Sequence, residues 1–394
     1  MVAKDSLATC ERAPWDAGSQ PSCVFESTQL EKLIQELWRL GYNVVGPTLS
    51  DGAIVYGTIH SVTNLPEGWT EEQSPGRYRV KRSPDHAFFG CSIGPQSWKK
   101  YLHPSLVRLW RAERHDSTFR ILNNDAKPTL PKAFFGVRAC DLAAIAVQDR
   151  VLLEDRYRDS VYAEQRAAAC LIAVQCTQSA ATCFCASMGT GPLVTTSADL
   201  ILTELNGHGR HRFLARAGSE LGKNLLEGLE TGAATNTDLA EAQSLIDGAT
   251  AGQVRSIDTE GIRDLLYRSF EHPRWEAVAA RCLSCANCTM VCPTCFCTTV
   301  EDSTDVTGIH AERWRRWDSC FTQAFSYIHG GSVRTSGKAR YRQWITHKLA
   351  AWIDQFGSSG CVGCGRCITW CPAGIDITEE ARALCQGENH HGNA

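Results

Sequence analysis

Two cysteine runs constrain what this chain can fold into more than any other feature. The first is Cys282-Leu-Ser-Cys285-Ala-Asn-Cys288-Thr-Met-Val-Cys292-Pro293, and the second is Cys361-Val-Gly-Cys364-Gly-Arg-Cys367-Ile-Thr-Trp-Cys371-Pro372. Both follow the spacing C-x₂-C-x₂-C-x₃-C-P of bacterial ferredoxins. The two-residue gaps let a tight loop wrap three thiolates around one face of an iron–sulfur cube. The fourth cysteine lies one turn further on, where proline keeps it out of the same loop.

The pairing of the runs predicts how the ligands are shared. In two-cluster ferredoxins the fourth cysteine of each run ligates the cluster of the other run. Applied to this sequence, the rule assigns a first [4Fe-4S] cluster to Cys282, Cys285, Cys288 and Cys371, and a second to Cys361, Cys364, Cys367 and Cys292. Zinc also binds paired C-x₂-C units and is the alternative, although zinc rarely needs a third cysteine two residues on followed by C-P.

A third group of cysteines follows two predicted strands. Cys140 comes after the buried-type strand Lys132–Arg138, Cys176 ends the strand Leu171–Cys176, and Cys183 and Cys185 lie in the next loop. Ligands gather at the carboxyl ends of parallel strands, so these four thiols are a candidate site for a third iron–sulfur cluster. The alternative is four buried, inert thiols, because free cysteine is among the most buried residue types.

Composition narrows the class of protein. The chain has 394 residues, 43% hydrophobic residues and a formal net charge of −3. This balance suits a globular protein and gives no reason to expect nucleic acid or an anionic membrane as a partner. No apolar run approaches the ~20 residues that span a bilayer, and the N-terminus has no secretory apolar region. Twenty cysteines without a secretion signal indicate metal ligation in a reducing compartment, so we expect the cytoplasm.

Hydrophobic patterning predicts an α/β N-terminal domain with a mixed sheet. The strands 132–138 and 171–176 flank helices at about 142–153 and 162–169, a βαβ arrangement whose strands are parallel, with Asp141 as the helix N-cap. We expect a poorly structured lead-in over residues 1–27, the α/β domain over 28–231, and a connecting helix and linker over 232–256.

The C-terminal part is predicted to be a mainly α-helical, ferredoxin-like dicluster domain over residues 257–385, followed by a frayed tail over 386–394. Sixty-eight residues separate Cys292 from Cys361, and we expect them to form a closed excursion of helices. From Arg313 to Lys348 this insert has eight Lys and Arg against one carboxylate, Asp318. That excess could offset cluster charge, dock an acidic partner, or form a solvated face.

Other motifs bear on function mainly by their absence. The sequence contains no G-x-G-x-x-G, no G-x₄-G-K-[ST] and no G-x-S-x-G, so it shows no recognisable nucleotide-binding fingerprint. Two adjacent clusters without a substrate motif indicate electron transfer. Cys295, Cys297 and Cys320 lie near the first run, as spare thiols or as donors to cluster sulfur.

Several blocks of the sequence together resemble a known family. FFGVRACDLAAIAVQD, AVQCT…TCFCASMGTGP, RCLSCANCTMVCPTCFC and RYRQWITHKL are similar to the iron–sulfur β subunit of cytoplasmic sulfhydrogenases, a family that includes the A subunit of anaerobic sulfite reductase. The resemblance spans roughly residues 75–375. It implies a subunit that relays electrons between a flavin subunit handling NAD(P)H and a catalytic partner.

The resemblance leaves the partner open. In the hydrogenase case the partners are the small and large subunits of a nickel–iron hydrogenase, and in the sulfite reductase case the partner carries sirohaem. In both cases the chain itself is a non-catalytic electron-transfer subunit. The contrasting hypothesis is a self-contained redox enzyme with a cofactor site near Cys140.

Overall fold

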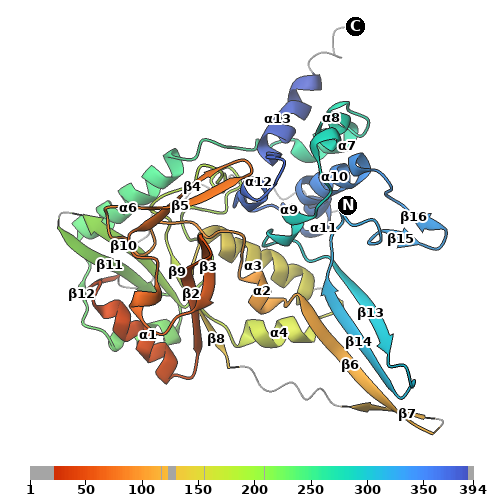
Figure 1. The fold of residues 1–394 in the computed structure, drawn as a ribbon. Helices are drawn as coiled ribbons and strands as arrows, with labels where there is room; N and C mark the ends of the chain where they lie inside the picture. Colours follow the sequence, from red (N-terminus) through yellow and green to blue (C-terminus); the bar gives the residue numbers. More distant parts are fainter. Residues whose placement is uncertain (1–21, 117, 123–129, 155, 208, 389–394) are drawn as a thin grey trace, which may run out of the picture.

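An eight-stranded mixed sheet forms the centre of the N-terminal part (Figure 1). The computed structural model describes residues 22–388 except 117, 123–129, 155 and 208. The strand order is β12-β1-β11-β10-β9-β8-β2-β3, in which β2, β8, β9 and β10 are parallel to one another and the other pairs are antiparallel. The strands are β1 (Cys23–Glu26), β2 (Asn43–Ser50), β3 (Ala53–Thr58), β8 (Lys132–Val137), β9 (Cys170–Val174), β10 (Leu200–Gly207), β11 (Arg210–Ala217) and β12 (Gly232–Ala233).

Helices cover both faces of this sheet. On one face α1 (Gln29–Arg39) and α5 (Glu220–Glu227) bury an apolar cluster that includes Phe135. On the other face α2 (Lys99–Leu102), α3 (Ala139–Leu152) and α4 (Ser160–Ala167) pack on a cluster that includes Phe134. Neighbouring strand residues therefore face opposite sides, as the period of two in a strand requires. Each such buried side chain contributes about 1.5–3 kcal/mol to folding.

The predicted βαβ unit is confirmed. The expected strands and helices are present as β8, α3, α4 and β9, and β8 pairs with β9 in parallel. Because β8 and β9 are parallel neighbours, their carboxyl ends lie at the same edge of the sheet, where Cys140 and Cys176 follow. The mixed sheet of the N-terminal part is likewise confirmed.

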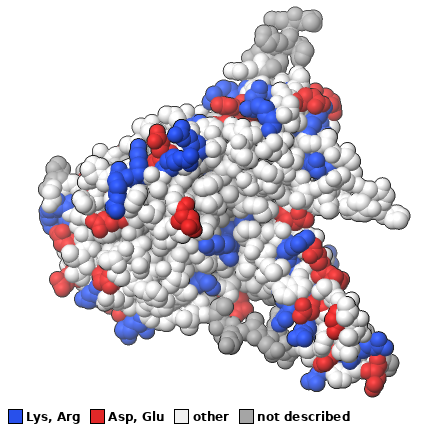
Figure 2. All heavy atoms as spheres, in the orientation of Figure 1, with Lys and Arg blue, Asp and Glu red and all other residues white. Residues whose placement is uncertain are grey.

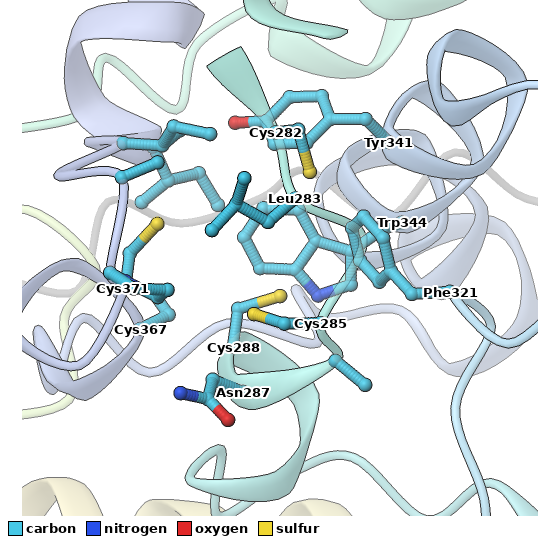
Figure 3. A pocket seen from close by; sticks show the side chains of 15 residues that line it. Cys282, Leu283, Cys285, Asn287, Cys288, Phe321, Tyr341, Trp344, Cys367 and Cys371 are labelled. Atoms are coloured by element: carbon cyan, nitrogen blue, oxygen red, sulfur yellow. The ribbon is translucent and has the colours of Figure 1, made fainter.

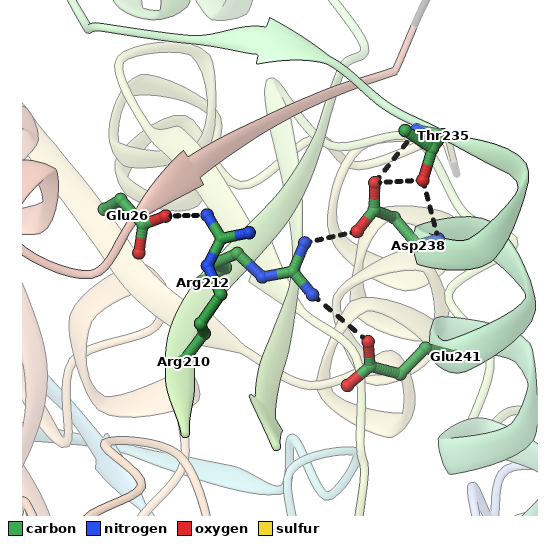
Figure 4. Close-up of polar contacts among 6 residues, drawn as sticks. All are labelled: Glu26, Arg210, Arg212, Thr235, Asp238 and Glu241. Atoms are coloured by element: carbon green, nitrogen blue, oxygen red, sulfur yellow. Dashed lines mark hydrogen bonds and ion pairs between the residues drawn. The ribbon is translucent and has the colours of Figure 1, made fainter. Parts of the chain in front are cut away.

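Residues 232–256 contain the connecting helix, which packs on the sheet. Helix α6 (Asn236–Ala251) buries Ala242 against Leu205 of β10 and Leu214 of β11. Arg212 of β11 pairs with Asp238 and Glu241 of this helix (Figure 4). The side chain of Asp238 also accepts a hydrogen bond from the Thr235 backbone N–H at 2.9 Å, which caps the helix.

The ends of the chain differ from the expectation in part. Residues 1–21 of the expected lead-in lie outside the described residues, but residues 23–26 form strand β1, so the prediction is wrong for them. Phe25 is buried opposite Phe213 of β11, and Arg210 of that strand pairs with Glu26 (Figure 4). At the other end, α13 (Ile377–Glu388) continues to residue 388, and residues 389–394 lie outside the described part.

The C-terminal part is not mainly helical, and that prediction is corrected. Helices surround the cysteine runs: α7 (Ile262–Arg268), α8 (Arg274–Arg281), α9 (Asn287–Met290), α10 (Gly337–Thr346), the π-helical segment η2 (His347–Ala351), α11 (Trp352–Phe356), α12 (Arg366–Thr369) and α13. The insert between the runs, however, also contains strands β13 (Thr298–Thr304) and β14 (His310–Trp317). These strands join β6 (Leu106–His115) and β7 (Thr118–Leu122) in the order β13-β14-β6-β7.

This four-stranded antiparallel sheet projects from the body of the molecule as an arm (Figure 1). Its inner pair joins segments about two hundred residues apart, with Trp110 opposite Arg313. A strand whose partner lies so far along the chain gives little local signal, which is why the insert was expected to be helical. Smaller elements complete the fold: η1 (Val62–Asn64), the hairpin β4 (Trp69–Ser74) and β5 (Arg77–Arg82), and the hairpin β15 (Tyr327–Ile328) and β16 (Gly331–Ser332). Among the described residues, no helix combines the length and apolarity needed to cross a bilayer.

Candidate metal centres

The two cysteine runs adopt the same backbone conformation. Each run contains two residues with positive φ. One precedes the second cysteine: Ser284 at 51° in the first run and Gly363 at 62° in the second. The other precedes the short helix that carries the third cysteine: Ala286 at 67° and Gly365 at 72°. Such turns curl the chain so that successive cysteines point toward a common centre. The equivalent turns show that the sequence repeat is also a structural repeat.

Glycine is required in the second run for a further reason. A Cβ on Gly363 would lie 2.6 Å from the Cα of Cys185, and one on Gly365 would lie 2.3 Å from the Thr182 carbonyl oxygen. Real side chains do not approach backbone so closely, so any larger residue would push the loop 182–185 away. The second run therefore presses directly against the loop that carries Cys183 and Cys185.

The first pocket, site 1, lies between the two runs (Figure 3). Three of its cysteines come from the first run, and Cys371 and Cys367 come from the second. Its remaining walls are mainly apolar, with Phe321, Tyr341 and Trp344 among them. Cys285 is exposed, so site 1 reaches the surface on that side. The cysteines that the crossed rule assigns to the first cluster all line this pocket: Cys282, Cys285, Cys288 and Cys371.

The second pocket, site 2, has no exposed cysteine in its lining. It is lined by Cys361, Cys364 and Cys367 of the second run and by Cys292 of the first. The residues that the crossed rule assigns to the second cluster are therefore also together. Cys367 lines both pockets, so sites 1 and 2 are adjacent.

Lys348 provides a buried cation at site 2. Its ammonium group, on the π-helical segment η2, donates to Cys292 Sγ at 3.2 Å, to Thr294 Oγ1 at 2.9 Å and to the Gly360 carbonyl oxygen at 3.3 Å. Burial alone would lower the pKa of Lys348, but the thiolates of Cys292, Cys295 and Cys361 raise that pKa well above its usual range. This role of Lys348 was not assigned from the sequence, although a lysine at a buried position of an apolar helical stripe could have indicated it.

The cysteines near the first run form two hydrogen-bonded pairs, Cys295 with Cys292 and Cys320 with Cys297. A hydrogen bond from the Cys295 thiol, with Lys348 beside it, lowers the pKa of Cys292 well below its usual value. A hydrogen bond from Cys320 lowers the pKa of Cys297 to about 7. Lys99, buried at 4% exposure, donates to the Cys295 carbonyl oxygen at 3.1 Å. Cys295 is thus placed as a donor to sulfur at site 2, whereas Cys297 and Cys320 pair with each other.

The four cysteines of the α/β part also line one pocket, site 3. The structure brings together Cys140, Cys176, Cys183 and Cys185, and adds Cys91, Cys364, Arg138 and Arg366 to the lining. Burial raises the pKa of the Cys185 thiol to about 12. Cys364 lines both site 2 and site 3, so these two pockets are adjacent as well.

Asp141 has a different role from the expected one. The N-cap of α3 is Arg138, and Asp141 lies in the first turn, 1% exposed. It accepts two hydrogen bonds from the Arg366 guanidinium, at 2.9 and 3.1 Å, and one from the Tyr56 hydroxyl at 3.0 Å. The N-cap prediction is wrong because this carboxylate pairs with a guanidinium 225 residues away instead of with its own helix.

Most of the basic residues between Arg313 and Lys348 pair with carboxylates that lie outside this range. Arg313 pairs with Asp302 at 2.6 Å, and Arg315 pairs with Asp159. Figure 2 shows charges of both signs interspersed along the arm. The basic residues of the insert therefore form no continuous basic surface on this face of the molecule. Further pairs of these basic residues include Arg316–Glu301, Lys338–Glu276 and Arg342–Glu271.

Comparison with known proteins agrees with this geometry. The 4Fe-4S dicluster domain family matches residues 281–375, which contain both runs. The chain is 32% identical over 276 residues to sulfhydrogenase 2 subunit beta of Pyrococcus furiosus, a match covering 68% of this chain and 80% of that relative. No solved structure matches the chain. The chain therefore belongs to the sulfhydrogenase β-subunit family, as an electron-transferring iron–sulfur subunit with a 4Fe-4S dicluster domain.

Proposed function

We propose that this chain relays electrons between a flavin subunit that handles NAD(P)H and the small and large subunits of a nickel–iron hydrogenase. One observation carries the proposal: two runs separated by 68 residues jointly line two adjacent pockets, each with the four cysteines that the crossed rule assigns to it. Cys282, Cys285, Cys288 and Cys371 would hold one [4Fe-4S] cluster at site 1, and Cys361, Cys364, Cys367 and Cys292 the other at site 2. Each cluster, when bound, supplies a one-electron carrier.

The spread of the cysteines supports clusters over zinc. Four thiolates on one zinc ion, with Zn–S of about 2.3 Å, lie only about 3.8 Å from one another. Within the described residues no group of three or more His, Cys, Asp or Glu is gathered closely enough to hold a single metal ion. The cysteines instead line pockets, which suits a larger multi-iron group.

The surroundings of the sites support a carrier rather than a catalytic centre. The walls of site 1 are mainly apolar and offer the thiols few polar groups that would orient a substrate. At site 2 the buried Lys348 offers positive charge to the thiolates. The sulfhydrogenase relative favours the hydrogenase complex over the sirohaem sulfite reductase. No disulfide joins any cysteine that the structure describes, which supports a reducing compartment, and we infer the cytoplasm.

The proposal is tested in the intact complex, isolated from its host through a tag on this chain. We expect the native complex to reduce NAD(P)⁺ with hydrogen. A Cys288→Ser variant should lose most of that activity yet keep hydrogen-dependent reduction of a viologen dye, which takes electrons at the hydrogenase subunits. Cys385→Ser, an exposed cysteine outside the sites, is the control.

Two results would contradict the proposal. If Cys288→Ser kept full NAD(P)⁺ reduction, electrons would not pass through site 1. If the isolated chain oxidised NAD(P)H by itself, the self-contained redox enzyme would be the better description.

A further inference from the structure

We propose that Cys140, Cys176, Cys183 and Cys185 hold a third iron–sulfur cluster at site 3. The thiols come from three places in the sequence and line one pocket. Cys140 lies in the first turn of α3 after β8, Cys176 follows β9, and the other two lie in the loop that leads on toward β10. Four thiolates bind [2Fe-2S] and [4Fe-4S] clusters alike, so the chemical class is fixed and the iron count distinguishes the type.

Hydrogen bonds attach the loop that carries two of these thiols to the second cysteine run and to Gln253. The Phe184 backbone N–H donates to the Gly363 carbonyl oxygen at 2.9 Å, and Thr190 Oγ1 donates to the Val362 carbonyl oxygen at 2.7 Å. Gln253 Nε2 donates to Cys185 Sγ at 3.1 Å. Such N–H···S contacts are among the means by which proteins adjust cluster potentials. Inert thiols in an apolar core would need none of these supports.

Space beside the thiols is kept by a glycine. A Cβ on Gly191 would lie 3.1 Å from Cys185 Sγ and 3.7 Å from the backbone N of Cys140. A side chain there would crowd the wall of site 3, between two of its sulfur-bearing residues. The Gly-rich stretch after Cys185 thus leaves room at the thiols.

A buried cation without an anionic partner adds an independent argument. Arg138 is 7% exposed, and its guanidinium donates to the carbonyl oxygens of Phe89, Cys91 and Gln175 at 2.6, 2.9 and 3.2 Å. It also lies 4.0 Å from Cys176 Sγ. No carboxylate among the described residues forms an ion pair with it, although a buried charge needs one. The thiolates of a cluster would supply the missing negative charge.

The shared lining residues then set the order of the sites, an assignment that rests on the proposed function. Cys367 belongs to the walls of sites 1 and 2, and Cys364 to the walls of sites 2 and 3. Site 2 therefore lies between sites 1 and 3, which are the two ends of the relay. An electron that enters at one end leaves at the other, with no net change in the chain.

Iron content of the anaerobically purified full chain tests the proposal. We expect about twelve irons per chain if site 3 holds a [4Fe-4S] cluster, or about ten if it holds a [2Fe-2S] cluster. Cys183→Ser and Cys185→Ser should each lower the content toward about eight and remove one signal from the electron paramagnetic resonance spectrum of the reduced protein.

Cys385→Ser is the control, because Cys385 is exposed and lines none of the three sites. This variant should keep the full iron content. If Cys185→Ser kept the third cluster, or if Cys385→Ser lost as much iron as Cys185→Ser, the ligand set would be wrong.

The iron content of the native protein tests the third cluster even if a variant fails to fold. About eight irons would overturn the third cluster and leave the two-cluster relay intact. About four irons, or stoichiometric zinc, would overturn the proposed function itself. A second variant, Arg138→Gln, keeps all four thiols and should shift the midpoint potential of one cluster to a more negative value; an unchanged set of potentials would remove the charge argument.

Discussion

Lys348 places a positive charge directly against a sulfur atom of site 2. A fixed cation near a cluster favours the reduced, more negative state and so raises the midpoint potential. We expect Lys348→Met to lower the potential of one cluster by an amount on the order of 100 mV, the size of one charge at hydrogen-bond distance in a partly screened interior. A redox titration followed by electron paramagnetic resonance measures this shift.

The control for that prediction is Lys338→Met. Lys338 lies on the neighbouring helix α10 and pairs with Glu276 at 2.9 Å, far more exposed than Lys348. Its replacement should leave all potentials within error. Equal shifts in both variants, or an unchanged potential in Lys348→Met with full iron content, would show that the contact with Cys292 does not tune site 2.

Cys371 tests the crossed ligand set. It belongs to the second run by sequence but lies in site 1 with the cysteines of the first (Figure 3). Cys371→Ser should therefore change the spectrum of the cluster held by Cys282, Cys285 and Cys288. The same variant should leave the signal that Lys348→Met shifts unaltered. A change confined to that other signal would mean that each run binds its own cluster.

At the scale of elements, the pair of Asp141 and Arg366 joins α3 of the α/β part to α12 of the second run. Both side chains are at least nine-tenths buried. Asp141→Asn leaves the guanidinium without its charge partner, and breaking a buried pair in this way costs about 3–5 kcal/mol. We expect a clear fall in the thermal unfolding temperature, measured by circular dichroism under anaerobic conditions.

An exposed pair is the comparison for Asp141. Asp302 and Arg313 pair at 2.6 Å on the arm, where both side chains are largely solvated. Because solvent screens this exposed pair, Asp302→Asn should leave the thermal unfolding temperature nearly unchanged. If the two variants unfolded at the same temperature, the junction between α3 and α12 would contribute little to stability.

The features that depend on local sequence patterns could be predicted, whereas those that depend on contacts between residues far apart in the chain could not. The βαβ unit was recognisable because β8 and β9 carry continuous apolar runs, and the cysteine runs because their ligand spacing is local. The arm was not, because β6 finds its partner β14 about two hundred residues later. The partners of Asp141 and Lys348 could not be predicted for the same reason: Arg366 lies 225 residues from Asp141, and Cys292 lies 56 residues from Lys348.

At the scale of the whole molecule, a buried histidine makes stability depend on pH. His103 is 1% exposed, and neither ring nitrogen has a hydrogen-bond partner among the described residues. Burial, with Arg315 and Lys99 nearby, lowers its pKa to about 3. Below about pH 6.5 His103 is protonated in the unfolded chain but stays neutral in the folded chain. The free energy of unfolding therefore falls as the pH falls from about 6.5 toward 3.

The expected size follows from linkage. From pH 7 to pH 5, His103 alone should cost about 2 kcal/mol of unfolding free energy. His103→Phe, which keeps the bulk of the ring, should remove that part of the acid sensitivity. Chemical unfolding at the two pH values measures the difference, with His329→Phe on the exposed β15–β16 turn as control. An unchanged pH dependence in His103→Phe would assign the acid sensitivity to other groups.

The sharing of both dicluster pockets between the two runs has a consequence for biosynthesis. A nascent chain leaves the ribosome from its N-terminus, and domains tend to fold in that order. Neither site 1 nor site 2 has all four of its cysteines until the second run has been translated. All four thiols of site 3 have been translated once residue 185 has been added. The loop that carries two of them, however, packs against Gly363, which is translated much later. The clusters of sites 1 and 2 can therefore be completed only after the second run has been translated, so iron delivery to these sites follows that step.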